Sequence, residues 1–94
     1  METVTNRTNI NKEIHVTAWY FRKRRASFTS FPKRMEFDRQ EYTFADGLRF
    51  LVVRGKRAVQ LFDMTDGANN YRLRFDSQNH MWTLVSITNA PRAA

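Results

Sequence analysis

The feature of the sequence best suited to bind anions is a run of four consecutive cations, Arg22, Lys23, Arg24 and Arg25. Guanidinium groups pair bidentately with phosphate oxygens, and a lysine adds a point charge. Trp19 and Phe21 stand just before the run, and aromatic faces of this kind stack on unpaired bases at roughly 1 to 3 kcal/mol each. Together, these residue types predict contacts with a nucleic acid.

Most of the remaining positive charge falls in the same part of the chain. Residues 22–57 contain eleven of the 16 Lys and Arg but four of the nine acids, and the chain as a whole carries a net charge of +7. If their strands are neighbours, further cations extend the patch, namely Lys33, Arg34, Arg54, Lys56 and Arg57. Such a field attracts nucleic acids, acidic membrane surfaces or acidic protein segments. The opposing interpretation is a solvated hairpin tip whose charge serves solubility alone.

The aromatic residues Trp19, Phe21 and Phe31 admit two other interpretations. They form either a protein-binding patch or the second face of a rolled sheet, which would place them in the core. The core interpretation is favoured because large exposed aromatic patches are uncommon on monomers. Trp82, which precedes polar Thr83, is also expected in the core.

The sequence contains no recognisable catalytic motif. His15, within a strand, and His80, in a turn, are the only histidines, and neither belongs to a nucleophile or metal motif. A small nuclease that uses them with nearby Arg, Lys and Glu stays an open alternative. The lack of Cys excludes thiolate zinc sites, and residues 63–67 lack the oxygen ligands that a calcium loop needs. We therefore predict a protein that is not an enzyme and holds no metal or cofactor.

The elements that position these residues are predicted to be β-strands. In residues 13–22 every second residue from Ile14 to Tyr20 is apolar, in a run rich in β-forming residues. In residues 71–76 the large apolar side chains alternate with Arg72 and Arg74, which are expected to face water or a partner. Turn signals recur about every 8 to 12 residues, the spacing of a meander, small barrel or sandwich.

These patterns predict an all-β fold, a single small antiparallel barrel or rolled sheet of six to seven short strands. The chain has 94 residues, which suffices for one core. We expect the β domain to span residues 13–87, with flexible tails at 1–12 and 88–94. The architecture is similar in kind to small SH3-like and OB-fold barrels, many of which bind nucleic acids or peptides, although no sequence motif supports a family assignment.

The uncharged stretches are far shorter than the roughly 18 residues of a membrane span, and residues 1–13 have no apolar region typical of a secretion signal. A cytoplasmic protein without integral membrane association is therefore expected. The leading hypothesis is a small basic module that binds DNA or RNA through phosphate contacts. The alternative is a protein-interaction or assembly module that uses an aromatic surface or an open sheet edge, its basic patch attracting an acidic protein.

Overall fold

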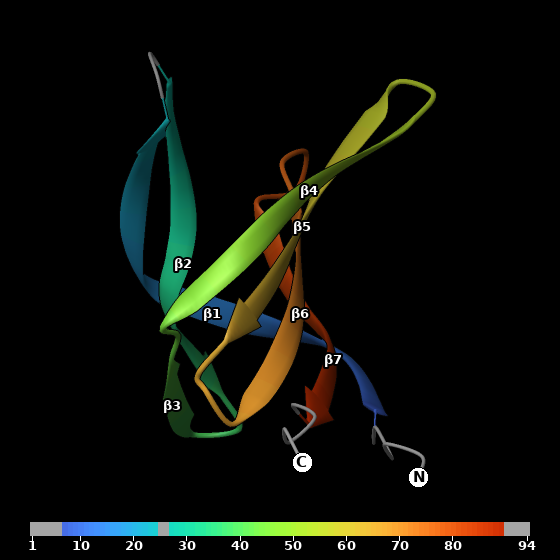
Figure 1. Cartoon of the computed structure of the whole chain (residues 1–94). Coiled ribbons are helices and arrows are strands. Elements are labelled where there is room, and N and C mark those ends of the chain that lie inside the picture. The colour runs from blue at the N-terminus through green and yellow to red at the C-terminus, as the bar shows by residue number, and fades with distance from the viewer. Residues whose placement is uncertain (1–6, 25–26, 90–94) are drawn as a thin grey trace, which may run out of the picture.

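The computed structural model describes residues 7–24 and 27–89, which form seven β-strands and the turns between them. In chain order the strands are β1 Arg7–Arg24, β2 Ser27–Phe37, β3 Gln40–Thr43, β4 Asp46–Arg54, β5 Arg57–Thr65, β6 Asn69–Asp76 and β7 Met81–Asn89. They build one antiparallel sheet with the order β3-β2-β1-β7-β6-β5-β4 (Figure 1). The prediction of an all-β antiparallel fold of six or seven strands is confirmed.

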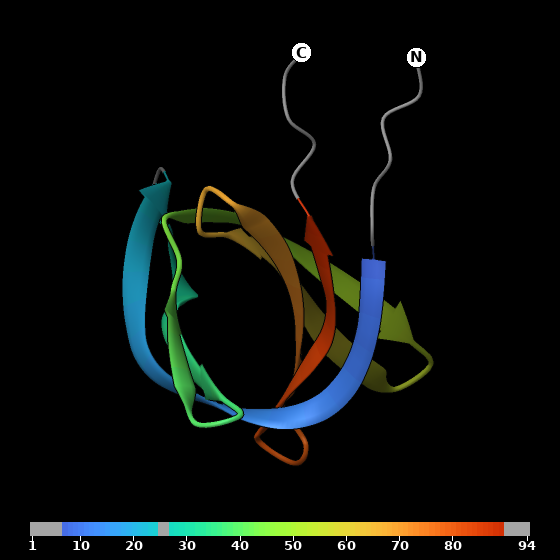
Figure 2. The ribbon, with the colours of Figure 1, turned by 90° about the horizontal axis from the view of Figure 1, so that it is seen from below.

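Strand β1 is long enough to pair with two neighbouring strands one after the other, and the sheet curves along it. Its first part, from Arg7 to Ile14, pairs with β7, and its second part, from His15 to Arg24, pairs with β2. Register shifts interrupt both ladders, and Asn11 has a φ of 53° within one of these irregularities. Bulges of this kind bend a strand and increase its twist. Figure 2 shows β1 curving along one side of the roll.

The sheet is not closed into a barrel, so of the two predicted forms only the open, rolled sheet is consistent with the structure. Strands β3 and β4 are its two edges, and no ladder joins them within the described residues. Single hydrogen bonds fasten the connection between them to other strands. The Phe44 amide donates to the Lys33 carbonyl at 2.8 Å, and the Ala45 amide donates to the Thr65 carbonyl at 2.7 Å. An open sheet keeps two edges with unpaired backbone groups.

The core lies on the concave face of the roll, which we call the inner face, and the opposite face is the outer face. Fully buried side chains converge there from several strands: Met35, Phe44, Met64, Leu73 and Leu84. Rings from strands that are distant in the sheet order meet across the core. Phe31 of β2 meets the edge of Phe62 of β5 at 5.9 Å between centroids, and Phe44 lies 5.3 Å from Tyr71 of β6. Tyr71 and Leu73 of β6 are buried in this core, so Arg72 and Arg74, which alternate with them, occupy the outer face as the pattern predicts.

The sheet extends further toward both ends of the chain than the sequence pattern indicates. Residues 7–12, expected in a flexible tail, belong to β1 and pair with β7, and residues 88–89 belong to β7. These segments consist mainly of polar residues. A strand is recognised in a sequence by apolar residues that alternate with polar ones, and these segments offer almost no such alternation. The remainder of the expected tails, residues 1–6 and 90–94, lies outside the described residues.

A two-residue turn joins β2 to β3, and both of its residues adopt the left-handed region. Asp38 has a φ of 53° and Arg39 a φ of 64°. Tight hairpins favour such turns because their twist matches that of the strands, and Gly is the preferred second residue. In this left-handed conformation the Cβ atom of Arg39 crowds the backbone, and glycine avoids this steric cost because it has no Cβ.

Replacing Arg39 with glycine is therefore expected to raise the free energy of unfolding by on the order of 0.5 to 1 kcal/mol. Urea denaturation measures the change. Arg39→Ala is the matched control, since it removes the same charge but keeps the Cβ atom, and it should bring no gain. Equal stability of the two variants would contradict the explanation.

The loop between β5 and β6 is organised by one carboxylate. Asp66 Oδ1 accepts hydrogen bonds from the amides of Ala68 and Asn69 at 2.9 and 2.8 Å, and Oδ2 accepts one from the Tyr71 hydroxyl at 2.7 Å. Burial tends to raise the pKa of Asp66, but these hydrogen bonds outweigh it and lower the pKa overall. Burial, reinforced by the hydrogen bond to Asp66, raises the pKa of Tyr71 to about 12.

The raised pKa of Tyr71 makes stability depend on pH in the alkaline range. Folding favours the neutral phenol, so this contribution is complete below pH 10.0, the ordinary tyrosine pKa, and declines as the pH rises toward about 12. Urea denaturation at several pH values across this window should show the wild type losing more stability than Tyr71→Phe. Parallel losses in the two proteins would show that Tyr71 does not titrate in this way.

Candidate functional site

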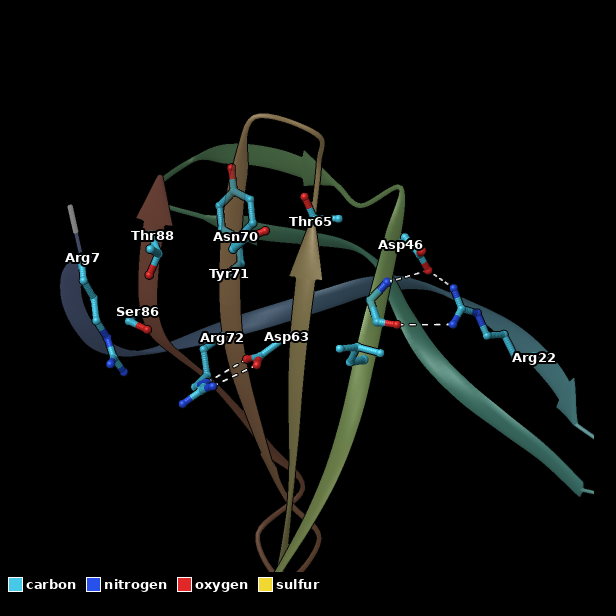
Figure 3. Close-up of a pocket in the computed structure, with 12 residues that line it drawn as sticks. Arg7, Arg22, Asp46, Asp63, Thr65, Asn70, Tyr71, Arg72, Ser86 and Thr88 are labelled. Carbon is cyan, nitrogen blue, oxygen red and sulfur yellow. Dashed lines mark hydrogen bonds and ion pairs between the residues drawn. The ribbon is translucent and has the colours of Figure 1, made fainter. Parts of the chain in front are cut away.

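Arg22, the first cation of the predicted run, is held by contacts within the protein. Its guanidinium forms an ion pair with Asp46 and donates to the Gly47 carbonyl at 3.3 Å (Figure 3). It also lies over the Phe31 ring, 5.0 Å from the centroid. These contacts fasten β1 to the beginning of β4, and Asp46 already balances the charge of Arg22.

Lys33 is engaged in a similar way on β2. Its Nζ donates to the Phe44 carbonyl at 2.9 Å and lies 5.7 Å from the centroid of the Tyr20 ring. Two of the predicted phosphate-binding residues, Arg22 and Lys33, thus hold the beginning of β4 and the connection before it against the β1–β2 hairpin. Their contacts give them a structural role that charge and position in the sequence do not reveal.

The aromatic residues beside the predicted run are on the surface. Trp19 is 49% exposed and Phe21 70% exposed, so the interpretation that places them in the core is wrong for both. Phe31, by contrast, is buried. Lys23 is exposed on the β1–β2 hairpin, whereas Arg25 and the side chain of Arg24 lie outside the described residues.

Three of the other predicted cations, Arg54, Lys56 and Arg57, do not extend this patch. Arg34 is exposed on β2, whereas Lys56 and Arg57 belong to the hairpin between β4 and β5, at the other end of the sheet order. Figure 1 shows the β1–β2 and β4–β5 hairpins diverging from each other. The predicted residues therefore form separate groups and not one continuous track.

The structure instead gathers arginines in a groove of about 530 Å³ on the outer face. We call it the arginine groove, and its cations come from four strands: Arg7, Arg54, Arg57, Arg72 and Arg74. Aliphatic side chains complete its lining: Val52, Val59, Leu61 and Val85. Asp76 is the only acid among the described residues that line it.

The charges of the arginine groove are only partly balanced. Arg54 and Arg57 stand directly opposite each other across the β4–β5 ladder, where like charges destabilise a sheet. Arg57 donates to Asp76 at 2.7 Å. Among the described residues, Arg7, Arg54 and Arg74 have no ion-pair or hydrogen-bond partner for their side chains. An anion bound between these guanidinium groups would relieve their mutual repulsion.

A neighbouring pocket of about 580 Å³ shares Arg7 and Arg72 with the arginine groove, so the two lie side by side on the outer face. Figure 3 shows this pocket, with Arg7 on one side and the pair of Arg72 and Asp63 in the middle. Arg72 donates to both oxygens of Asp63, at 2.7 and 2.9 Å, and this bidentate pair raises the pKa of Arg72. Asp63 therefore fixes the Arg72 guanidinium in place and weakens the positive field toward this pocket.

Three of the five groove arginines, Arg7, Arg72 and Arg74, were absent from the predicted patch, whereas Arg54 and Arg57 belonged to it. Arg72 and Arg74 alternate with buried residues and so had to lie on one outer face. Arg7 carried no such signal, because it reaches the groove only through the pairing of β1 with β7.

The two histidines considered for a nuclease line one pocket of about 390 Å³. His15 and His80 share it with Glu13. Trp82, which was expected in the core, lies beside them and is only partly buried, packed against the core. The described residues that line this pocket include no Arg or Lys. A phosphodiester bound there would find acid and base groups but no cation to stabilise its charge.

Within residues 7–24 and 27–89, no three His, Asp or Glu side chains are grouped so as to hold a metal ion. No helix among the described residues could span a membrane. The chain matches no family model, no curated protein sequence and no solved structure.

Proposed function

We propose that this protein is a small, non-enzymatic module that binds the backbone of DNA or RNA in the arginine groove. The observation that carries the proposal is the convergence of five arginines from four strands on one groove, where Asp76 is the single acid among the described lining residues. Arginine is the residue best suited to bind phosphate, because its planar fork offers paired donors. Three of these side chains, Arg7, Arg54 and Arg74, have no partner among the described residues and are available for a ligand.

The lining of the groove also indicates what it recognises. Between the arginines it offers aliphatic side chains such as Val59 and Leu61, and no aromatic ring or amide is among its described lining residues. Stacking on bases needs aromatic faces, and base-specific hydrogen bonds commonly come from Asn or Gln as well as Arg. The groove therefore fits phosphates along a strand and should bind with little sequence preference.

The salt dependence of binding tests this proposal. Titrating the protein with fluorescently labelled single-stranded and duplex DNA and RNA of mixed sequence should give affinities that fall linearly on a log–log plot against salt. The slope should be about −0.9 per phosphate neutralised on duplex DNA and about −0.7 on single strands. Oligonucleotides of different sequence but equal length should bind within a few-fold of one another.

Two results would contradict the proposal. The first is an affinity that hardly changes with salt, and the second is no binding of any of these nucleic acids at low salt. An acidic polypeptide such as polyglutamate, titrated in parallel, serves as the competing polyanion. Tighter binding of the polypeptide than of every nucleic acid would favour an acidic protein as the partner and overturn the assignment to nucleic acid.

A further inference from the structure

Strand β4 is an open edge of the sheet that lacks two common forms of edge protection, a bulge and a proline. Among the described residues it pairs with β5 alone, in an unbroken nine-residue register. Its one inward-facing charge is Arg49, which lies opposite the buried Phe62. Figure 1 shows that the β4–β5 hairpin projects beyond the body of the roll, so its outer part is uncovered.

Apolar side chains are exposed on both faces of this strand. On the outer face Leu48 is 62% exposed and Phe50 45%, and on the inner face Leu51 is 58% and Val53 62% exposed. An apolar edge of this length is a template for pairing with another strand.

The free backbone N–H and C=O groups that β4 presents to its open side are arranged symmetrically about Leu51. Arg54 and Arg57 flank a two-residue turn, so the backbone groups of Arg54 face β5. Because these directions alternate, the groups of Arg49, Leu51 and Val53 point away from β5 toward the open side. Arg22 already binds the Gly47 carbonyl, which leaves those three residues, centred on Leu51, as the free stretch.

We propose that two copies of this chain pair through β4, antiparallel, around a two-fold axis at Leu51. Arg49 then lies opposite Val53 of the second copy, and the three free residues of each strand bond to those of the other. Phe50 lies opposite Val52 of the other copy, and an aromatic ring facing a β-branched side chain is a favourable cross-strand pair.

The charges on β4 favour a second copy in this direction. The strand begins with Asp46 and ends with Arg54, so antiparallel pairing brings each cationic end toward the acidic end of the other strand. Asp46, which keeps its ion pair with Arg22 of its own chain, is diagonal to Arg54 of the second copy and within reach of its long side chain. The basic turns, with Gly55 and Lys56 at their tips, are kept at opposite ends of the dimer, whereas parallel pairing would place them together.

This inference goes beyond the proposed function and is independent of it, because it needs no nucleic acid. Sedimentation of the nucleic-acid-free protein over a range of concentrations should show a species of about twice the 11.2 kDa chain mass, which persists in high salt. Leu51→Lys places two like charges opposite each other at the axis and should shift the protein to 11.2 kDa. Phe21→Lys is the matched control, because Phe21 is 70% exposed on β1, and it should remain dimeric.

A cysteine scan tests the register, since the chain contains no Cys. Opposite residues of an antiparallel pair are about 5.5 Å apart at Cα, a distance that a disulfide spans. Mild oxidation should therefore cross-link Leu51→Cys into a covalent dimer but leave Val53→Cys uncross-linked, because the two copies of residue 53 lie several residues apart along the strands. A wild type that stays at 11.2 kDa, or a dimer in which Leu51→Cys fails to cross-link, overturns the proposal.

Discussion

Replacing Arg7 and Arg74 together with alanine is expected to lower the affinity for DNA or RNA by on the order of 60-fold at 0.1 M salt, because each lost phosphate contact costs roughly eightfold through counterion release. Both side chains line the arginine groove from the outer face and have no partner among the described residues, so their removal leaves no buried charge unpaired. The log–log salt slope should fall by about 2 in magnitude. Fluorescence anisotropy at several salt concentrations measures both quantities.

The matched control removes two positive charges elsewhere. Arg34 is exposed on β2, and Arg39 lies in the turn between β2 and β3, where asparagine tolerates its φ of 64°. The variant Arg34→Ala with Arg39→Asn has the same net charge as the groove variant. It should keep most of the affinity, with a slope close to that of the wild type. Equal losses in the two variants would show that net charge alone, and not the groove, attracts the nucleic acid.

Replacing Phe44 with alanine is expected to lower the free energy of unfolding by about 3 to 5 kcal/mol. Phe44 is fully buried in the connection between β3 and β4, and its ring packs 5.3 Å from that of Tyr71. It packs between the two ends of a sheet that no ladder closes within residues 7–24 and 27–89. A domain of this size has a total stability on the order of 5 to 14 kcal/mol, so this one substitution removes a large part of it.

Urea denaturation followed by tryptophan fluorescence gives the change in stability, because Trp82 packs 5.3 Å from the core residue Phe62 and reports on the core. Phe21→Ala is the control of the same residue type on an exposed site. It should change the stability by no more than about 0.5 kcal/mol. A loss below about 1 kcal/mol in Phe44→Ala would mean that the roll is held together without this contact.

The sequence of this protein determines where its strands and turns lie and which way some of its side chains point. Alternation in β6 fixed the inward direction of Tyr71 and Leu73, because side chains of a strand alternate with a period of two whatever strand lies beside it. Local chemistry also located turns: Gly55, with a φ of 59°, opens the hairpin between β4 and β5 as its sequence indicates. Fold class and most strand positions were therefore predictable from short stretches of residues.

Only the tertiary structure decided which cations act together and which edge stays open. Arg22 forms its ion pair with Asp46, which lies 24 positions away in the sequence. Arg7 and Arg74 line the same groove because only β7 lies between β1 and β6 in the sheet. The opening of the roll at β3 and β4 is likewise a result of strand order, which no local pattern encodes. The physical reason is that the alternation and the turns depend on neighbouring residues, whereas the ladders depend on contacts between segments far apart in the chain. The basic character of this all-β protein was thus evident from its sequence, but the gathering of five of its arginines in one groove came from the pairing of the strands.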